Sequence, residues 1–129
     1  MRPIEKRAYS GTAQIAGTPY TSSIWKDIGP SDNLSSVYVV YALDGKWTTF
    51  VADVGPDSDS RADAVIDFEV YLDGRQLGET HRTTVTRSAH IEEKVTEGVQ
   101  LRLVAKHVSG STNGAYTGQA AWGSARLEN

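Results

Sequence analysis

Four aspartates surround a short Gly-Pro turn, and carboxylates gathered by a turn can bind calcium. They are Asp53, Asp57, Asp59 and Asp63. Calcium takes about six to eight oxygen ligands from carboxylates and carbonyls, and a flexible loop over residues 55–61 could supply several of them. The spacing is not that of an EF-hand, so a solvated polar loop is the alternative. Asp53, Asp57 and Asp59 are therefore the candidate ligands of a structural calcium ion, and no other cofactor is expected.

A second pair of carboxylates, Asp67 and Glu69, is the nearest approach to a catalytic motif. On one face of a strand they could approach the roughly 5 to 9.5 Å that separates the two carboxylates of a glycosidase, but alternation along strands produces such pairs routinely. The three histidines, His81, His90 and His107, share no metal-ligand spacing. Neither a Gly-x-Ser-x-Gly elbow nor a glycine-rich phosphate loop with its lysine occurs. The sequence predicts a protein that is not an enzyme.

Composition argues against several other classes of function. The chain has no cysteine, and its net charge of −3 comes from 13 basic and 16 acidic residues. Disulfides, thiolate metal sites and cysteine nucleophiles are therefore excluded, which is compatible with either side of a bacterial membrane. The basic residues are scattered, and only Lys6 and Arg7 are adjacent. Nucleic-acid binding needs a basic stripe, so we expect no such partner.

The sequence also carries no signal for a membrane. No apolar run approaches the roughly 20 residues that span a bilayer, and residues 1–10 lack the apolar segment of a signal peptide. We expect a cytoplasmic protein if this is the whole chain. If the sequence was cut from a longer protein, a secreted location is the alternative.

The clearest periodic stretch covers residues 64–74. Ile66, Phe68, Val70 and Leu72 alternate with the polar or aromatic residues Asp67, Glu69 and Tyr71. A period of two places these sets on opposite faces of a strand. Asp73-Gly74 suits a tight turn, after which residues 76–78 could return antiparallel. This segment predicts a strand with one buried face, followed by a hairpin.

Other short strands follow the same logic along the chain. We expect them at residues 12–15, 19–22, 37–42, 48–54, 81–87, 89–95, 100–105 and 120–127, with a hairpin hinge at Ala16-Gly17. Strands at roughly 8 to 12 residue spacing, without helical periodicity, favour a single antiparallel β-sandwich. The length of 129 residues fits one domain. We expect an N-terminal arm over residues 1–10 and the sandwich over residues 11–129.

Five sequence phrases occur in an order that is typical of one known family. They are Thr12-Ala-Gln-Ile-Ala-Gly-Thr-Pro-Tyr20, Trp47-Thr-Thr-Phe-Val-Ala-Asp-Val-Gly55, Phe68-Glu-Val-Tyr-Leu-Asp-Gly74, Val99-Gln-Leu-Arg-Leu-Val-Ala105 and Ala121-Trp-Gly-Ser-Ala-Arg-Leu127. In this order the chain resembles the NPCBM domains, also classed as family 51 of the carbohydrate-binding modules. The resemblance implies a jelly-roll-like all-β sandwich and a non-catalytic module, attached to a glycoside hydrolase, that binds galactose or N-acetylgalactosamine residues of glycans. It also implies a structural calcium ion.

A sugar site on such a scaffold needs an aromatic face and planar polar groups, both of which loops at one end of a sandwich can supply. The candidates are Trp25 in the first loop and Asn113, Tyr116 and Gln119 in the last, with His107 and Arg102 nearby in sequence. The alternative is that Trp25 covers the core and that residues 108–118 form only a mobile loop. Trp47 and Trp122 lie inside strand phrases, so we expect them to fill the core or its lid.

The approach to the last tryptophan differs from the family pattern. Residues 118–121 read Gly-Gln-Ala-Ala and contain no carboxylate where the family usually has an acidic residue, and the segment between Tyr20 and Val37 is short. A protein–protein interaction or assembly domain that keeps the sandwich without binding sugar is therefore the alternative function.

Overall fold

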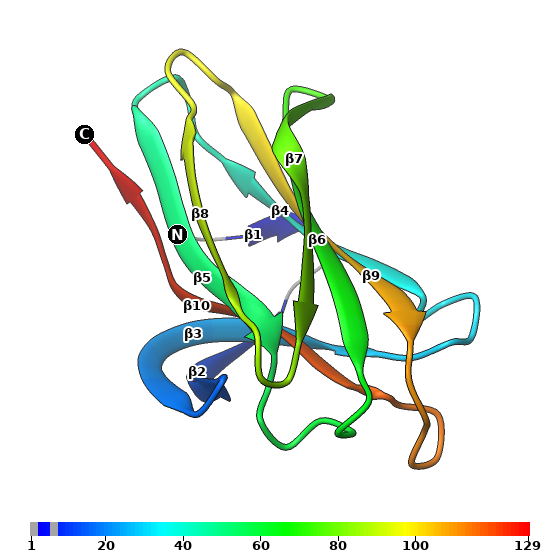
Figure 1. The fold of residues 1–129 in the computed structure, drawn as a ribbon. Coiled ribbons are helices and arrows are strands. Elements are labelled where there is room, and N and C mark those ends of the chain that lie inside the picture. The colour runs from blue at the N-terminus through cyan, green and yellow to red at the C-terminus, as the bar shows by residue number, and fades with distance from the viewer. Residues whose placement is uncertain (1–2, 6–7) are drawn as a thin grey trace.

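The chain folds into two antiparallel β-sheets that pack face to face (Figure 1). The computed structural model describes residues 3–5 and 8–129, the first three only through their strand pairing. The strands are β1 (Pro3–Glu5), β2 (Tyr9–Ile15), β3 (Thr18–Ile28), β4 (Ser36–Ala42), β5 (Thr49–Pro56), β6 (Val65–Leu72), β7 (Arg75–Thr84), β8 (Ala89–Lys94), β9 (Gln100–Ser109) and β10 (Gly118–Glu128). Over these residues no helix is long and apolar enough to cross a membrane.

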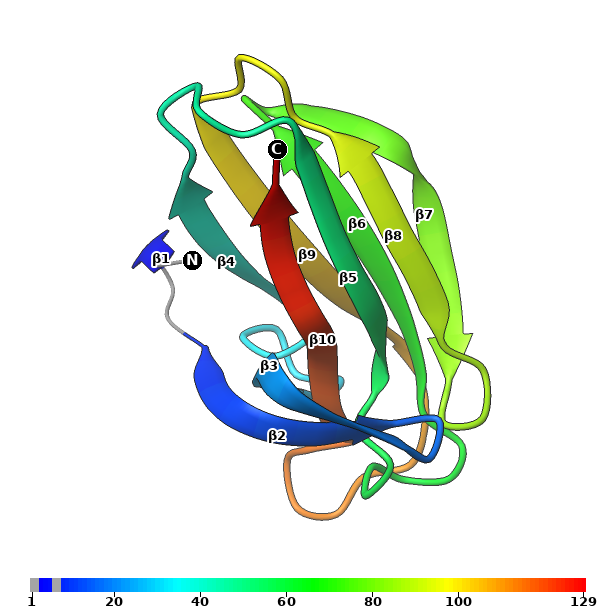
Figure 2. The ribbon, with the colours of Figure 1, turned by 90° about the vertical axis from the view of Figure 1, so that its left-hand side faces the viewer.

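Over the described residues each sheet has five strands. Sheet A has the order β1-β4-β9-β6-β7, and sheet B has the order β2-β3-β10-β5-β8. In Figure 2 the strands β10, β5 and β8 of sheet B lie in front of β9 and β6 of sheet A. Neighbours within a sheet are often distant in sequence, as β10 and β3 are. The predicted antiparallel β-sandwich is confirmed.

The core lies between the sheets and contains the alternating residues of β6. Ile66, Phe68, Val70 and Leu72 are all buried, as the alternation predicts. The ring of Phe68 meets the edge of Trp122 from β10, with ring centroids 5.4 Å apart and an interplanar angle of 86°. Trp122 is fully buried, whereas Trp47 is partly buried and packs against the core. Both tryptophans are therefore structural, as expected.

The predicted hairpins form where residues adopt a positive φ. Asp73 and Gly74, with φ of 50° and 84°, connect β6 to β7, and Leu72 pairs with Arg75. Two consecutive residues with positive φ give the type I′ geometry that matches the twist of paired strands. Ala16 and Gly17 connect β2 to β3 in the same way, with φ of 50° and 81°.

Several strands differ from their predicted limits because pairing with a neighbouring strand decides where they begin and end. β3 runs to Ile28 alongside β10, so the prediction that Trp25 lies in a loop is wrong. β7 is one strand instead of a short return followed by a second strand, and β9 continues to Ser109. Residues 3–5, which we expected in an arm, pair with β4, and Tyr9 already belongs to β2. Residues 1, 2, 6 and 7 of that arm lie outside the described part of the chain.

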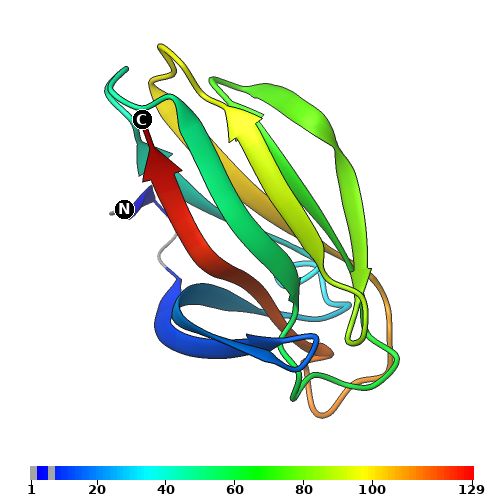
Figure 3. The same ribbon diagram turned by 60° about the vertical axis from the view of Figure 1, so that its left-hand side comes forward.

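One end of the sandwich gathers the connections on which the site depends. The loop from β5 to β6 and the loop from β9 to β10 lie side by side there, as the green and orange loops at the bottom of Figure 3 show. The backbone N–H of Arg61 in the first loop donates to the carbonyl of Thr117 in the second, at 2.9 Å. We call this region the loop end.

Candidate functional site

An open cleft with a volume of about 690 Å³ lies at the loop end. Its walls come from the end of β3, the β5–β6 loop, the β9–β10 loop and the start of β10. The lining residues are Asp27, Asp59, Ser60, Arg61, Ala62, Asn113, Tyr116, Thr117, Gly118 and Gln119. We call it the first cleft. Most of its lining side chains carry hydrogen-bonding groups, which suits a polar ligand.

The two loops of the first cleft are held together by Asp63. Its carboxylate accepts hydrogen bonds from the backbone N–H of Ser111 at 3.0 Å and from the Ser111 hydroxyl at 2.9 Å. These bonds stabilise the charged carboxylate and lower the pKa of Asp63 below its ordinary value. The Nε of Arg61 donates to the same hydroxyl at 3.1 Å. Asp63 thus positions Arg61 at the cleft through Ser111.

Gln119 and Asp27 form the floor of the cleft from neighbouring strands. They are paired in the register of β10 and β3, and the Gln119 side-chain amide donates to an Asp27 carboxylate oxygen at 3.3 Å. The backbone N–H of Gln119 also donates to the hydroxyl of Ser60 at 3.1 Å. This close approach requires a glycine at position 118, because a Cβ there would collide with the Ser60 side chain and lie 3.0 Å from its Cα. The floor is therefore built by backbone packing as well as by side chains.

Tyr116 stands at the rim on a small hairpin. The backbone N–H of Asn113 donates to the carbonyl of Tyr116 at 2.9 Å, and Gly114 makes the turn with φ of 69°. Gly29 touches the carbonyl of Ala115 so closely that a Cβ would clash, which seats the hairpin against the end of β3. Tyr116 remains 46% exposed. In the part of the chain that the structure describes, neither its hydroxyl nor the Asn113 side-chain amide has a hydrogen-bond partner.

The structure brings together three of the five predicted sugar-binding residues. Asn113, Tyr116 and Gln119 all line the first cleft. His107 does not line it, but its Nε2 lies 2.9 Å from the hydroxyl of Thr117, which does. Trp25 is elsewhere.

Trp25 lies on β3 and packs on the outer face of sheet B. It contacts a small cluster formed by Ala13, Ile15 and Ala121, and it stacks on Tyr9 with ring centroids 6.2 Å apart. The alternative for Trp25 was that it covers the core. Trp25 does pack on buried apolar residues, but these belong to the small cluster and not to the main core.

Two charged cleft residues were missed by the sequence analysis, namely Asp27 and Arg61. Asp27 enters the cleft because β3 continues alongside β10, so the pairing of Asp27 with Gln119 is the signal that could have identified it. The guanidinium of Arg102, which was expected nearby, instead lies 4.7 Å from the ring centroid of Tyr38 on the outer face of sheet A.

The predicted calcium ligands are engaged separately. The carboxylate of Asp53 lies 2.9 Å from Nδ1 of His90, and that of Asp57 accepts the backbone N–H of Asp59 at 2.9 Å. Over residues 3–5 and 8–129 no three or more His, Asp or Glu side chains are grouped as a metal site would require. This arrangement does not fit a carboxylate-built site, and calcium binding stays a prediction. A higher melting temperature in calcium than in EDTA would support it, and equal temperatures would remove it.

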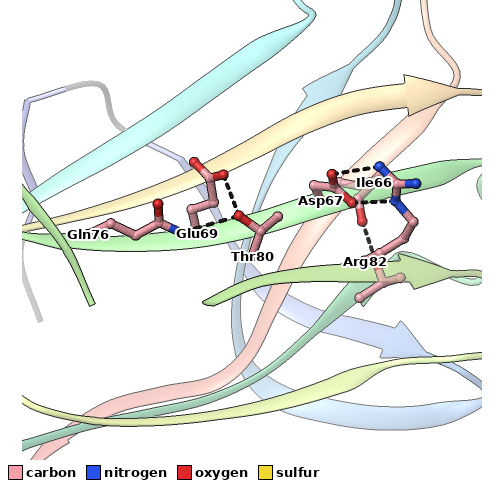
Figure 4. Close-up of polar contacts among 7 residues, drawn as sticks. Ile66, Asp67, Glu69, Gln76, Thr80 and Arg82 are labelled. Atoms are coloured by element: carbon pink, nitrogen blue, oxygen red, sulfur yellow. Dashed lines mark hydrogen bonds and ion pairs between the residues drawn. The ribbon is translucent and has the colours of Figure 1, made fainter. Parts of the chain in front are cut away.

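Asp67 and Glu69 belong to cross-strand contacts on the outer face of sheet A (Figure 4). Arg82 donates to both oxygens of Asp67, at 2.9 and 3.1 Å. Glu69 accepts from the hydroxyls of Thr80 at 2.7 Å and Tyr71 at 2.8 Å. Side chains of the same sheet thus account for both carboxylates.

Glu69 is buried yet remains in its charged form at neutral pH. Burial alone would raise its pKa, but hydrogen bonds from Thr80, Lys106 and Tyr71 outweigh that effect and lower the pKa. The ammonium of Lys106 lies 3.0 Å from the carboxylate. Glu69 therefore forms a structural ion pair with Lys106 and also accepts hydrogen bonds from two hydroxyl groups.

Comparison with known proteins identifies one family. The family model described as the NPCBM/NEW2 domain matches residues 28–128, which is most of the chain. No curated protein matches the chain.

The solved structures with this fold include several from Clostridium perfringens. A CBM51 module of GH95 in complex with methyl-galactose is 22% identical, with a TM-score of 0.72, and the match covers 98% of this chain and 94% of that one. CBM51-2 of ZmpB, solved with GlcNAc and INT domains, is 20% identical with a TM-score of 0.70 and coverage of 99% and 28%. The ZmpB M60 catalytic domain with CBM51-1 and CBM51-2 is 21% identical with a TM-score of 0.70 and coverage of 100% and 14%.

The coverage values show how this chain relates to those proteins in length. The chain spans nearly all of the GH95 module, but only 28% and 14% of the two ZmpB chains. With TM-scores of 0.70 to 0.72, the chain has the fold of a carbohydrate-binding module, a class of domain that is itself non-catalytic. The partial coverage of the ZmpB chains shows that domains with this fold also occur inside larger proteins.

Proposed function

The chain belongs to the NPCBM/NEW2 domain family, and on this premise we propose that it is a non-catalytic carbohydrate-binding module that recognises a terminal galactose-type residue in the first cleft. The observation that carries the proposal is the convergence of an exposed aromatic ring with three kinds of polar group. Tyr116 supplies the ring, Asn113 and Gln119 the amides, Asp27 the carboxylate and Arg61 the guanidinium.

The chemistry of this set suits a pyranose. A sugar ring has an apolar face of C–H groups that can stack on an aromatic ring, and its hydroxyls both donate and accept hydrogen bonds. The half-exposed ring of Tyr116 offers such a face at the rim. Asp27 accepts and Arg61 donates, so adjacent hydroxyls of one sugar can be satisfied together.

Asp27 supplies a carboxylate near the segment before Trp122, where the sequence lacks the acidic residue of the family pattern. Gln119 stands in a segment without a carboxylate, but its cross-strand partner Asp27 brings one to the same part of the cleft. This arrangement supports sugar binding over the alternative of an assembly domain that has lost its site.

The choice of galactose rests on the GH95 module, which this chain matches over nearly its full length. That module was solved with methyl-galactose, and the match covers 94% of it, whereas the match covers 28% of the ZmpB chain that was solved with GlcNAc. We take N-acetylgalactosamine as a second ligand of the same type, and GlcNAc as the competitor that must be tested beside it. We also propose that the module serves an attached enzyme, such as a glycoside hydrolase.

Isothermal titration with methyl galactoside, N-acetylgalactosamine and GlcNAc tests the proposal. We expect a galactose-type sugar to bind best, and Tyr116→Ala and Arg61→Ala to remove measurable binding while the melting temperature is kept. Arg102→Ala is the matched control, because this arginine lies on the outer face of sheet A. Absence of binding to a broad glycan array, together with a defined dimer in light scattering, would contradict the proposal and favour the assembly domain.

A further inference from the structure

A second cleft adjoins the first. It has a volume of about 440 Å³ and is lined by Ala8, Tyr9, Lys26, Asp27, Asn33, Leu34 and Val37. Asp27 lines both clefts, so the two share a wall at the end of β3. Nothing in the proposed binding of one terminal sugar uses this second cleft.

An exposed aromatic ring marks each of the two clefts. Tyr9 is 59% exposed and lines the second cleft, while Tyr116 is 46% exposed and lines the first. No other tyrosine, tryptophan or phenylalanine in the described residues is exposed to this degree. Apolar surface left in water is unfavourable, so two such rings on neighbouring clefts indicate a shared ligand.

Tyr9 is held in position from behind. Its ring stacks on Trp25 with an interplanar angle of 29°, and the two residues are paired in the register of β2 and β3. A ring fixed in this way loses little side-chain entropy when a ligand stacks on it. Trp25, expected to bind sugar directly, would then act by supporting Tyr9.

The path from one ring to the other follows β3. Trp25 and Asp27 are two residues apart and lie on the same face of the strand, a separation of about 7 Å. Asp27 pairs with Gln119 in the first cleft, and Trp25 pairs with Tyr9. A chain-like ligand can therefore run from Gln119 past Asp27 to Tyr9.

Polar groups beside Tyr9 match those of a sugar site. The hydroxyl of Ser31 donates to the side-chain oxygen of Asn33 at 3.0 Å, which orients the amide and leaves its NH₂ group as a donor. Lys26 adds an ammonium group, which also donates to the carbonyl of Tyr38 at 3.4 Å. The second cleft thus repeats the combination of ring, amide and cation found in the first.

From these observations we propose that the second cleft binds the penultimate sugar of a glycan whose terminal galactose-type residue occupies the first cleft, with the penultimate ring stacked on Tyr9. The proposal rests on the proposed function. Under this proposal the protein recognises a disaccharide and its linkage, and the terminal residue is one half of the recognised structure.

Titration with methyl galactoside and with galactose-terminated disaccharides of α1,3, α1,4, β1,3 and β1,4 linkage tests this inference. We expect at least one disaccharide to bind about tenfold more tightly than methyl galactoside. Tyr9→Ala should reduce that disaccharide to the affinity of methyl galactoside and leave the affinity for methyl galactoside itself unchanged. Tyr9→Phe, which keeps the ring, should retain most of the gain.

A second variant tests the second cleft independently, in case Tyr9→Ala does not fold. Asn33→Ala removes an exposed amide of the second cleft, and it should weaken disaccharide binding selectively. Methyl galactoside binding without any gain from a second sugar would overturn this inference and leave the proposed function intact. Failure of every galactoside to bind would overturn both.

Discussion

The outer face of sheet A and the loop end of the sandwich carry similar side chains but use them differently. On sheet A, the hydrogen bonds to Asp67 and Glu69 come from adjacent strands and, through Tyr71, from the same strand. At the loop end, Tyr116 and Asn113 have polar groups without a partner in the described residues. Polar groups satisfied within a sheet stabilise it, whereas polar groups held open at a cleft are available to a ligand.

The difference follows from how each region is built. A strand places its neighbours at fixed separations on both sides, so a carboxylate on a sheet face meets donors across the ladder. The loop end depends on a few tertiary contacts, among them Asp63 with Ser111 and Gly29 with Ala115. We therefore expect substitutions on the sheets to change stability and substitutions at the loop end to change binding.

The largest expected effect on stability is that of Trp122→Ala in the core beneath both regions. Removal of this fully buried ring leaves a cavity beside Phe68 and should cost about 3–5 kcal/mol of unfolding free energy. Urea denaturation measures the loss. Trp25→Ala is the matched control and should cost less, because Trp25 is only partly buried. Equal losses would contradict the structural role assigned to Trp122.

Glu69→Ala should cause the next largest loss of unfolding free energy, and it should leave sugar binding unchanged. Three donors lose a buried, charged acceptor, so we expect a loss of about 2 kcal/mol in urea denaturation. Asp67→Ala is the matched carboxylate on the same face, and its partner Arg82 is mostly exposed. That variant should lose less than about 1 kcal/mol. Weaker galactoside binding by either variant would break the division between the two regions.

The pH dependence of stability sharpens the same comparison. The folded-state pKa of Glu69 is lowered, so its contribution is fully present above the ordinary value of 4.5 and is lost as the pH falls through the folded pKa. The stability difference between wild type and Glu69→Gln should therefore be constant near neutral pH and narrow below pH 4.5. Denaturation curves at pH 7 and pH 3.5 measure it. A difference that widens in acid would contradict the assigned hydrogen bonds.

The smallest expected change is at Asp63, which acts on the cleft through Ser111. Asp63→Ala removes the Asp63–Ser111 hydrogen bonds between the β5–β6 and β9–β10 loops, and we expect galactoside binding to weaken several-fold with little change in melting temperature. Asp32→Ala, an exposed aspartate in the β3–β4 loop, is the control. Unchanged affinity in Asp63→Ala would show that the loop position does not control the site.

The sequence predicts this fold well where the pattern is local. The alternation over β6 and the turn at Asp73-Gly74 depend on adjacent residues, and both were predicted. The second half of β3 has no such pattern, because it is defined by pairing with β10, and Gln119 lies 92 residues after Asp27. The same contrast between local and long-range contacts explains which site residues were predicted. Tyr116 and Asn113 lie in one loop and were found together, whereas Asp27 and Arg61 reach the cleft only through tertiary structure.

The most direct test of the account is a ¹H–¹⁵N NMR titration with methyl galactoside, which locates binding without any substitution. We expect shifts at Asp27, at residues 59–62 and at residues 113–119, and unchanged signals at Asp67, Glu69 and Lys106. Shifts centred on the outer face of sheet A would contradict the assignment of function to the loop end.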